Sequence, residues 1–134
     1  MAYYNSVYDC ALAVANGKVD AAVYDKPVLK NIAAKNEGMK VLDEILVPDR
    51  YGFAVSMDNQ ELKNEIDETL ENLKKSGVYS EMQQRWFPEH GAPLSMPVIE
   101  QSGLAGILLF GTAATSEPMS FVDSSQRIVG FDIE

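Results

Sequence analysis

Apolar positions at the start of the chain switch repeatedly between helical and strand-like spacing. A helical stripe behind the capping residue Ser6 predicts a helix from about residue 6 to 16. Residues 19–24 alternate between apolar and polar, which predicts a short strand. A proline suited to a first helical turn and a terminating glycine predict a second helix within residues 25–38, followed by a strand at 39–42. This succession is typical of a parallel α/β unit.

The middle of the chain contains the clearest helical pattern. Residues 51–56 are nearly all apolar, which predicts a strand covered on both faces. The capping residues 58–61 then open a helix that stops at Gly77. Its apolar stripe consists of Leu62, Ile66, Leu70 and Leu73. A shorter helix, 78–86, follows, and Pro88 closes it.

Composition changes after this helix. Proline, glycine and serine are concentrated in residues 88–105, which show little periodicity and are interpreted as a linker. Beyond the linker, residues 107–112 predict a strand and residues 113–119 a loop. Residues 120–122 and 127–131 predict the two strands of a β-hairpin. No internal repeat is visible.

Length and charge restrict the classes of function. A chain of 134 residues can bury one hydrophobic core but not two complete domains. Its 20 acidic and 11 basic residues give a net charge of −9, and no basic cluster exceeds Lys74-Lys75, so we expect no nucleic-acid partner. The longest apolar run, residues 104–110, is far below the roughly 20 residues of a membrane span, so we expect no membrane insertion.

The reactive residue types are scarce. Cys10 is the single cysteine, so neither a disulfide within the chain nor a zinc site built on paired cysteines is expected. Its apolar neighbours favour a buried, unreactive thiol. His90, the single histidine, lies in a segment rich in turn-forming residues and is interpreted as a solvated loop residue. We therefore expect no metal, no cofactor and no catalytic residue, and interpret the chain as a protein that is not an enzyme.

Three segments together resemble the family 3 extracellular solute-binding proteins, the amino-acid receptors of bacterial ABC importers. Residues 17–27 (GKVDAAVYDKP) look like a family segment near the end of the second lobe. Residues 51–87, from YGFAV to RWF, are similar to the family's closing segment, which returns to the first lobe. Residues 111–121 and 130–134 look like its opening strand and hairpin. The resemblance implies an α/β fold of the periplasmic-binding-protein type (type II), present as partial lobes with a parallel-rich sheet, flanking helices and a C-terminal β-hairpin.

The order of these segments is inverted, because the part that resembles a family C-terminal end comes first. The chain either spans the junction of two tandem domains or is a circular permutation that lacks most of the middle. Tandem domains are the simpler interpretation, with residues 1–87 ending one domain, 88–105 linking, and 106–134 opening the next. The strand-like run at 128–134 has no cap after it, so we expect a fragment of a longer protein.

Candidate ligand contacts follow from the chemistry of a free amino acid and from the resemblance. Asp25 lies between a predicted strand and a predicted helix, at the sheet edge where open α/β folds bind ligands, and a carboxylate suits an ammonium group. The alternative is that Asp25 only caps the helix. The resemblance assigns the same role to Asp25, a side-chain contact to Tyr24, and a ligand position, usually aromatic, to Ser116. Arg50, Arg85 and Arg127 match no carboxylate-binding motif of the family.

The resemblance predicts a protein that captures a small polar solute, in particular an amino acid, and delivers it to the membrane permease of an ABC importer. It places the parent protein in the periplasm or outside the cytoplasm. Two alternatives are the sensor domain of a signalling receptor of the histidine-kinase type and, less favoured, a dehydratase on the same fold. Within the fragment, the apolar strand at 107–112 lacks an obvious partner. We expect it either to fill a sheet position left empty by the missing first-lobe strands or to pair with a second copy in a strand-exchanged homo-oligomer.

Overall fold

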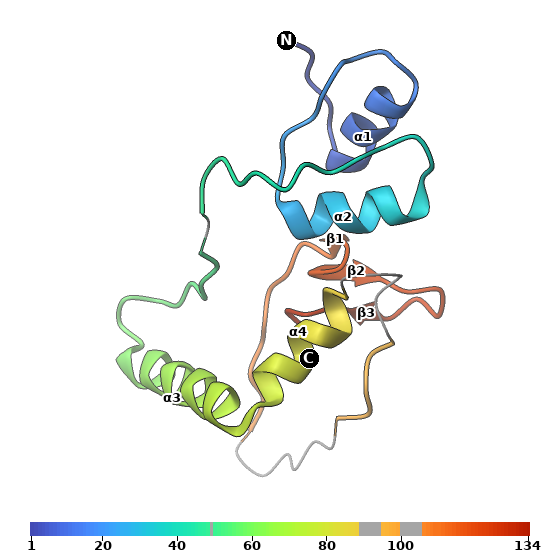
Figure 1. Ribbon diagram of the computed structural model, residues 1–134. Coiled ribbons are helices and arrows are strands. Elements are labelled where there is room, and N and C mark those ends of the chain that lie inside the picture. Colours follow the sequence, from blue (N-terminus) through green and yellow to red (C-terminus); the bar gives the residue numbers. More distant parts are fainter. Residues whose placement is uncertain (49, 89–94, 100–105) are drawn as a thin grey trace.

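The structure is a computed structural model that describes residues 1–48, 50–88, 95–99 and 106–134. It combines helices with one small sheet and is of the α/β kind (Figure 1). The helices are α1 (Val7–Ala15), α2 (Lys26–Lys35), α3 (Gln60–Ser76) and α4 (Val78–Trp86). The strands are β1 (Thr115–Ser116), β2 (Ser120–Val122) and β3 (Ile128–Val129).

Helices α1, α3 and α4 begin and end where their capping and terminating residues predict, which confirms these parts of the sequence interpretation. Helix α2 ends at Lys35, before Gly38, the glycine predicted to terminate it. The Ser6 hydroxyl accepts a hydrogen bond from the Asp9 amide at 3.1 Å and caps α1. The Asn59 side chain accepts one from the Leu62 amide at 3.1 Å and caps α3. Gly77, with φ of +87°, ends α3 and starts α4, a left-handed conformation that glycine adopts without a steric penalty.

Four strand predictions are wrong for the described residues. Segments 19–24, 39–42, 51–56 and 107–112 form no strand. An apolar or alternating segment becomes a strand only when a neighbouring strand receives its backbone hydrogen bonds, and no described segment provides that ladder. The predicted linker at 88–105 shows no regular structure at 88 and 95–99, and the rest of it lies outside the described residues.

The sheet in the described part of the chain is antiparallel, so the expectation of a parallel-rich sheet is wrong there. Its strand order is β1-β2-β3, with Ser116 opposite Ser120 and Phe121 opposite Val129. The predicted C-terminal hairpin is confirmed as β2 and β3. Strand β1 falls within residues 113–119, which were expected to form a loop.

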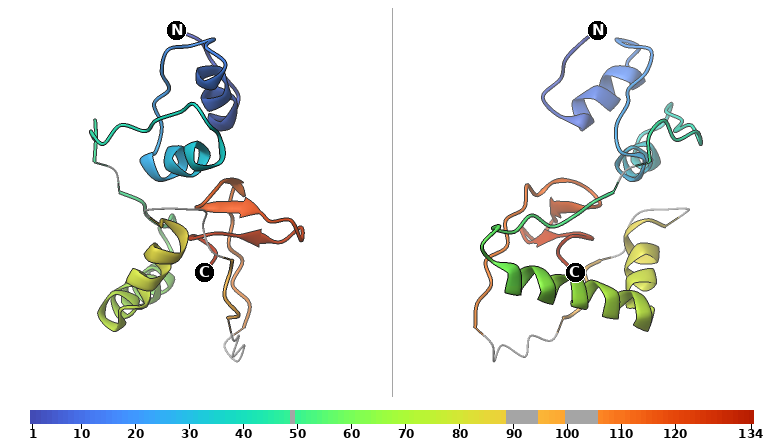
Figure 2. Two further views of the ribbon diagram at one scale, coloured as in Figure 1. Left: turned by 45° about the vertical axis from the view of Figure 1, so that its right-hand side comes forward. Right: turned by 90° about the vertical axis from the view of Figure 1, so that its left-hand side faces the viewer.

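Buried side chains form two neighbouring groups, one beside α1 and α2, which lie above the sheet in Figure 1, and one beside α4. In the first, Ala11 of α1 packs with Val28 and Ile32 of α2 and with Met119, which lies in the β1–β2 connection. In the second, Trp86 of α4 is 1% exposed and makes an edge-to-face contact with Phe121 of β2. Figure 2 shows the same order, with the sheet between α2 and α4. The sheet region therefore connects the part formed by α1 and α2 to the part formed by α4.

Helix α3 contributes no buried residue and packs mainly on α4. Its apolar stripe, Leu62, Ile66, Leu70 and Leu73, is only half-buried. The segment 107–110 is also largely exposed, although Phe110 contacts Phe53 with 6.0 Å between the ring centroids. No helix within the described ranges combines the length and the apolar character that a bilayer span requires.

Candidate functional site

Asp25 and Tyr24 lie where the chain enters α2. Asp25 is the N-cap residue, and its carbonyl oxygen accepts the first helical hydrogen bond from the Leu29 amide at 3.0 Å. Its carboxylate makes no capping hydrogen bond, and Pro27 in the first turn supplies no amide proton. The helix therefore starts at Asp25 without using the carboxylate. Tyr24 is half exposed beside it.

Ser116 lies in β1 and lines a hollow of about 340 Å³ between α1, α2 and the start of the sheet. The wall of the hollow is formed by Val7, Tyr8, Val28, Asn31, Ile32, Lys35, Ala114, Thr115, Ser116, Glu117, Phe121 and Val122. Asp25 and Tyr24 are not among them. The structure therefore does not gather the three predicted ligand contacts in one hollow, although helix α2 carries Asp25 at its start and forms a wall further along.

The hollow combines an apolar base with a few polar groups. Val28 and Ile32 are 2% and 5% exposed, and they form the base together with Phe121. Across the rim, the Lys35 ammonium donates to the Glu117 carboxylate at 2.5 Å, so these two charges neutralise each other. The Lys35–Glu117 pair also connects α2 to the turn after β1.

Asn31 is a functional candidate that sequence reasoning missed. It is only 8% exposed, and its side-chain oxygen has no hydrogen-bond partner among the described residues. The signal was present in the pattern, because a polar residue stands between the apolar Val28 and Ile32 on the buried side of α2. A polar residue on an apolar stripe is more informative than an exposed one, since its burial is costly without a partner.

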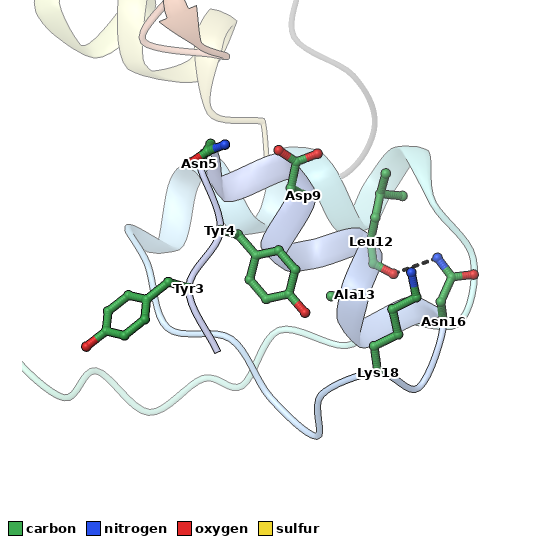
Figure 3. Close-up of a pocket in the computed structure, with 8 residues that line it drawn as sticks. All are labelled: Tyr3, Tyr4, Asn5, Asp9, Leu12, Ala13, Asn16 and Lys18. Carbon is green, nitrogen blue, oxygen red and sulfur yellow. Dashed lines mark hydrogen bonds between the residues drawn. The ribbon is translucent and has the colours of Figure 1, made fainter. Parts of the chain in front are cut away.

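A second hollow, of about 390 Å³, lies along α1 and the N-terminal segment (Figure 3). The Asn16 amide donates to the Leu12 carbonyl at 2.8 Å and completes the end of the helix. Asp9 accepts from the Ser6 hydroxyl at 2.8 Å. Tyr3 points away from the other side chains in Figure 3 and is 89% exposed. Asp9 and Asn16, two polar residues of this hollow, therefore make hydrogen bonds at the ends of α1. The polar side chains of the hollow do not converge on one ligand position.

Two of the three arginines that match no family motif are used in ion pairs inside the fold. Arg127 donates from Nε and Nη2 to one Asp123 carboxylate oxygen, at 3.0 and 2.9 Å. Arg85 donates to the Glu134 carboxylate, which also accepts from the Trp86 indole nitrogen at 2.6 Å. Neither guanidinium faces the hollow beside Ser116.

The remaining reactive side chains form no obvious centre. Cys10 is a free, partly buried thiol within α1. Across the described ranges, histidine, cysteine and carboxylate side chains do not gather in threes as metal ligands would. His90 lies outside the described residues.

Known proteins resemble this chain over about three fifths of its length. An arginine-binding periplasmic protein of Mannheimia haemolytica is 32% identical over 89 residues, which are 63% of this chain and 38% of that protein. The amino-acid-binding protein AabA of Dichelobacter nodosus is 34% identical over 86 residues, 62% of this chain and 34% of that protein. The glutamine-binding protein GlnH of a Bacillus subtilis ABC transporter is 29% identical over 80 residues, 60% of this chain and 29% of that protein.

No protein-family model matches the chain, and no solved structure matches it significantly. The relatives nonetheless agree in kind, since their names describe amino-acid-binding proteins, two of them periplasmic or part of an ABC transporter. These matches confirm the resemblance to the family 3 solute-binding proteins. The chain spans about a third of the length of the relatives it matches.

Proposed function

We propose that the chain is part of a binding protein that captures an amino acid in the periplasm and delivers it to the permease of an ABC importer. The similarity to amino-acid-binding proteins over about three fifths of the chain carries this proposal. The relatives' names refer to binding and transport, which favours import over a signalling sensor and over a dehydratase. On this proposal the protein is a receptor and not an enzyme.

Asp25 is proposed as the ligand's ammonium partner in the complete protein. Its carboxylate is not engaged in capping α2, so it is available for a second function. A carboxylate at the end of a strand-like segment and the start of a helix meets a cationic group by a charge-assisted hydrogen bond. Tyr24 precedes it and is proposed to contact the ligand's side chain. Ser116, in β1, is proposed as a ligand contact of the domain that residues 106–134 begin.

We also propose that the chain joins the end of one type II solute-binding domain (residues 1–87) to the beginning of the next (106–134) through a linker (88–105). Contacts between the two parts support a docked arrangement. The Glu134 carboxylate accepts from Arg85 and Trp86 of α4, and the Phe131 ring contacts the Phe87 ring at a tilt of 51°, with 4.9 Å between the centroids.

Calorimetric titration of the natural full-length protein tests the receptor proposal. Arginine, glutamine and histidine are suitable ligands, because relatives are named for binding them. Replacing Asp25→Asn is expected to weaken binding about 10- to 100-fold, the value of a hydrogen bond to a charged group. The matched Asp20→Asn change, at an exposed position in the preceding segment, is expected to leave affinity unchanged. The receptor proposal fails if no amino acid binds, and the role of Asp25 fails if both variants bind alike.

The fragment itself is proposed to form a strand-exchanged homo-oligomer. Ile107 and Leu109 are 93% and 91% exposed in a segment that pairs with no described strand. An apolar segment with unpaired backbone groups is a template for pairing with a second copy. Light scattering is expected to show a species larger than one chain, and a monomer whose residues 104–134 are rapidly cleaved by protease would contradict this proposal.

A further inference from the structure

The hollow beside Ser116 contains a polar group that the fold leaves without a partner. The Asn31 side-chain oxygen is buried and accepts no hydrogen bond from any described residue. A buried acceptor without a donor is unfavourable compared with an acceptor in water. The helix gains nothing from this amide, because an apolar side chain at the same position would pack beside Val28 and Ile32 without that cost.

The size and lining of the hollow suit a small molecule. A volume of about 340 Å³ lies at the lower end of the range of roughly 300–1,000 Å³ that is usual for ligand sites. The base is apolar, formed by Val28, Ile32 and Phe121. Such a site combines a wall for an apolar body with one polar group that orients the ligand. The Asn31 oxygen is out of contact with solvent, so a donor in the hollow reaches it only after rotation about the last torsion of Asn31, which has broad energy wells.

The charges around the hollow exclude a strongly charged ligand. Lys35 and Glu117 are paired with each other at 2.5 Å, so neither offers an unpaired charge. A zwitterion would therefore lose its hydration without gaining an ion pair. Asp25, the carboxylate proposed for an ammonium group, does not line this hollow.

We propose that this hollow binds a small neutral molecule with an apolar, ring-sized body and one N–H or O–H donor, which donates to Asn31. The site is separate from Asp25 and Tyr24, and it shares only its edge residue Ser116 with the amino-acid contacts proposed above. Ser116 and Thr115 form its edge on β1. Indole is a suitable probe, and benzofuran is its matched control, since it has the same shape and lacks the donor.

The test is titration of the 134-residue chain with indole and with benzofuran, followed by NMR. Indole is expected to bind at least about 5-fold more tightly than benzofuran, the value of one hydrogen bond to a buried neutral group. Indole is also expected to shift the side-chain amide resonances of Asn31, which benzofuran leaves in place. Equal affinity of the two probes, or no binding of either, would overturn the proposal.

Two variants test whether Asn31 causes the preference for indole over benzofuran. Asn31→Leu is expected to abolish the difference between indole and benzofuran, whereas Asn64→Leu, on exposed α3, is expected to retain it. If Asn31→Leu does not fold, the resonance shift in the unmodified chain decides the question. L-Arginine is expected not to displace indole. Displacement of indole by L-arginine would overturn this proposal and leave the receptor proposal standing. Failure of amino acids to bind the full-length protein would overturn the receptor proposal and leave this one standing.

Discussion

Asn31 shows how one side chain distinguishes a structural residue from a candidate binding residue. It occupies a position on α2 where Val28 and Ile32 are buried, and its own oxygen is unpartnered. Asp25 is the second example. It is the N-cap residue of α2, yet its carboxylate makes no capping hydrogen bond, so helix capping does not account for the carboxylate. Neither distinction follows from residue type. Both depend on where the side-chain atoms end up, which the sequence pattern does not specify.

Replacing Asn31→Leu is expected to stabilise the unliganded chain by about 1–3 kcal/mol, because it removes a buried acceptor that has no donor. Urea denaturation measures the free energy of unfolding of both proteins. The exposed Asn64→Leu change serves as the control and is expected to change stability by less than about 0.5 kcal/mol. A loss of stability in Asn31→Leu would mean that the amide is hydrogen-bonded in solution, and would contradict the account of the hollow.

At the scale of elements, helices were predictable and most strands were not. The signals for α1, α3 and α4 are local, because a cap, an apolar stripe and a stop residue lie within one segment. Segments 51–56 and 107–112 have strand-like sequences but no neighbouring strand in the described chain, so they form no strand. The sequence of β1 has no strand-like pattern of its own. It forms a strand because it pairs with β2, and this pairing could not be read from residues 113–119 alone.

Gly77 controls the joint between α3 and α4. Replacing Gly77→Ala is expected to destabilise the chain by about 1–2 kcal/mol, because a side chain is unfavourable at a φ of +87°. Thermal and urea denaturation measure this loss. Gly52→Ala is the matched control, since Gly52 has ordinary backbone geometry and no atom near the added methyl group, and it is expected to change stability little. Equal effects of the two changes would show that the joint is not formed as described.

Asp123 closes the turn of the β2–β3 hairpin. Hydrogen bonds from the Arg127 backbone, together with the Arg127 guanidinium and the Ser125 amide, lower the pKa of its carboxyl group. A carboxyl group with a lowered pKa in the folded state stabilises the fold above its ordinary pKa of about 3.9. That stabilisation is lost as the pH falls through the lower, folded-state pKa.

Replacing Asp123→Asn is therefore expected to reduce the free energy of unfolding at pH 7, and the difference from the unmodified chain is expected to shrink as the pH falls below about 3.9. Urea denaturation across this pH range measures it. The matched change Ser124→Ala, at an exposed position in the same turn that carries no ionisable group, is expected to show no such trend. A difference that stays constant with pH would show that the Asp123 charge does not stabilise the turn.

At the scale of the whole molecule, residues 1–87 and 106–134 contact each other: Arg85 and Trp86 donate to the Glu134 carboxylate, and Met119 packs with side chains of α1 and α2. The last residues pack under the sheet, where the amides of Phe131 and Asp132 donate to the carbonyls of Pro118 and Met119 at 3.1 and 2.9 Å. Gly130 permits this approach, because an added methyl group would lie 2.2 Å from the Met119 carbonyl oxygen. The sequence resemblance predicted the identity of the two parts, but it did not predict that they would dock on each other.

The single tryptophan offers the most direct test of this docked arrangement. Trp86 is 1% exposed and is held by the Glu134 carboxylate and the Phe121 ring, so acrylamide is expected to quench its fluorescence several-fold less in the native chain than in urea. Glu134→Ala is expected to increase quenching in native buffer, whereas Glu81→Ala, at an exposed position on α4, is expected to leave it unchanged. Quenching of the native chain equal to that in urea would contradict the account.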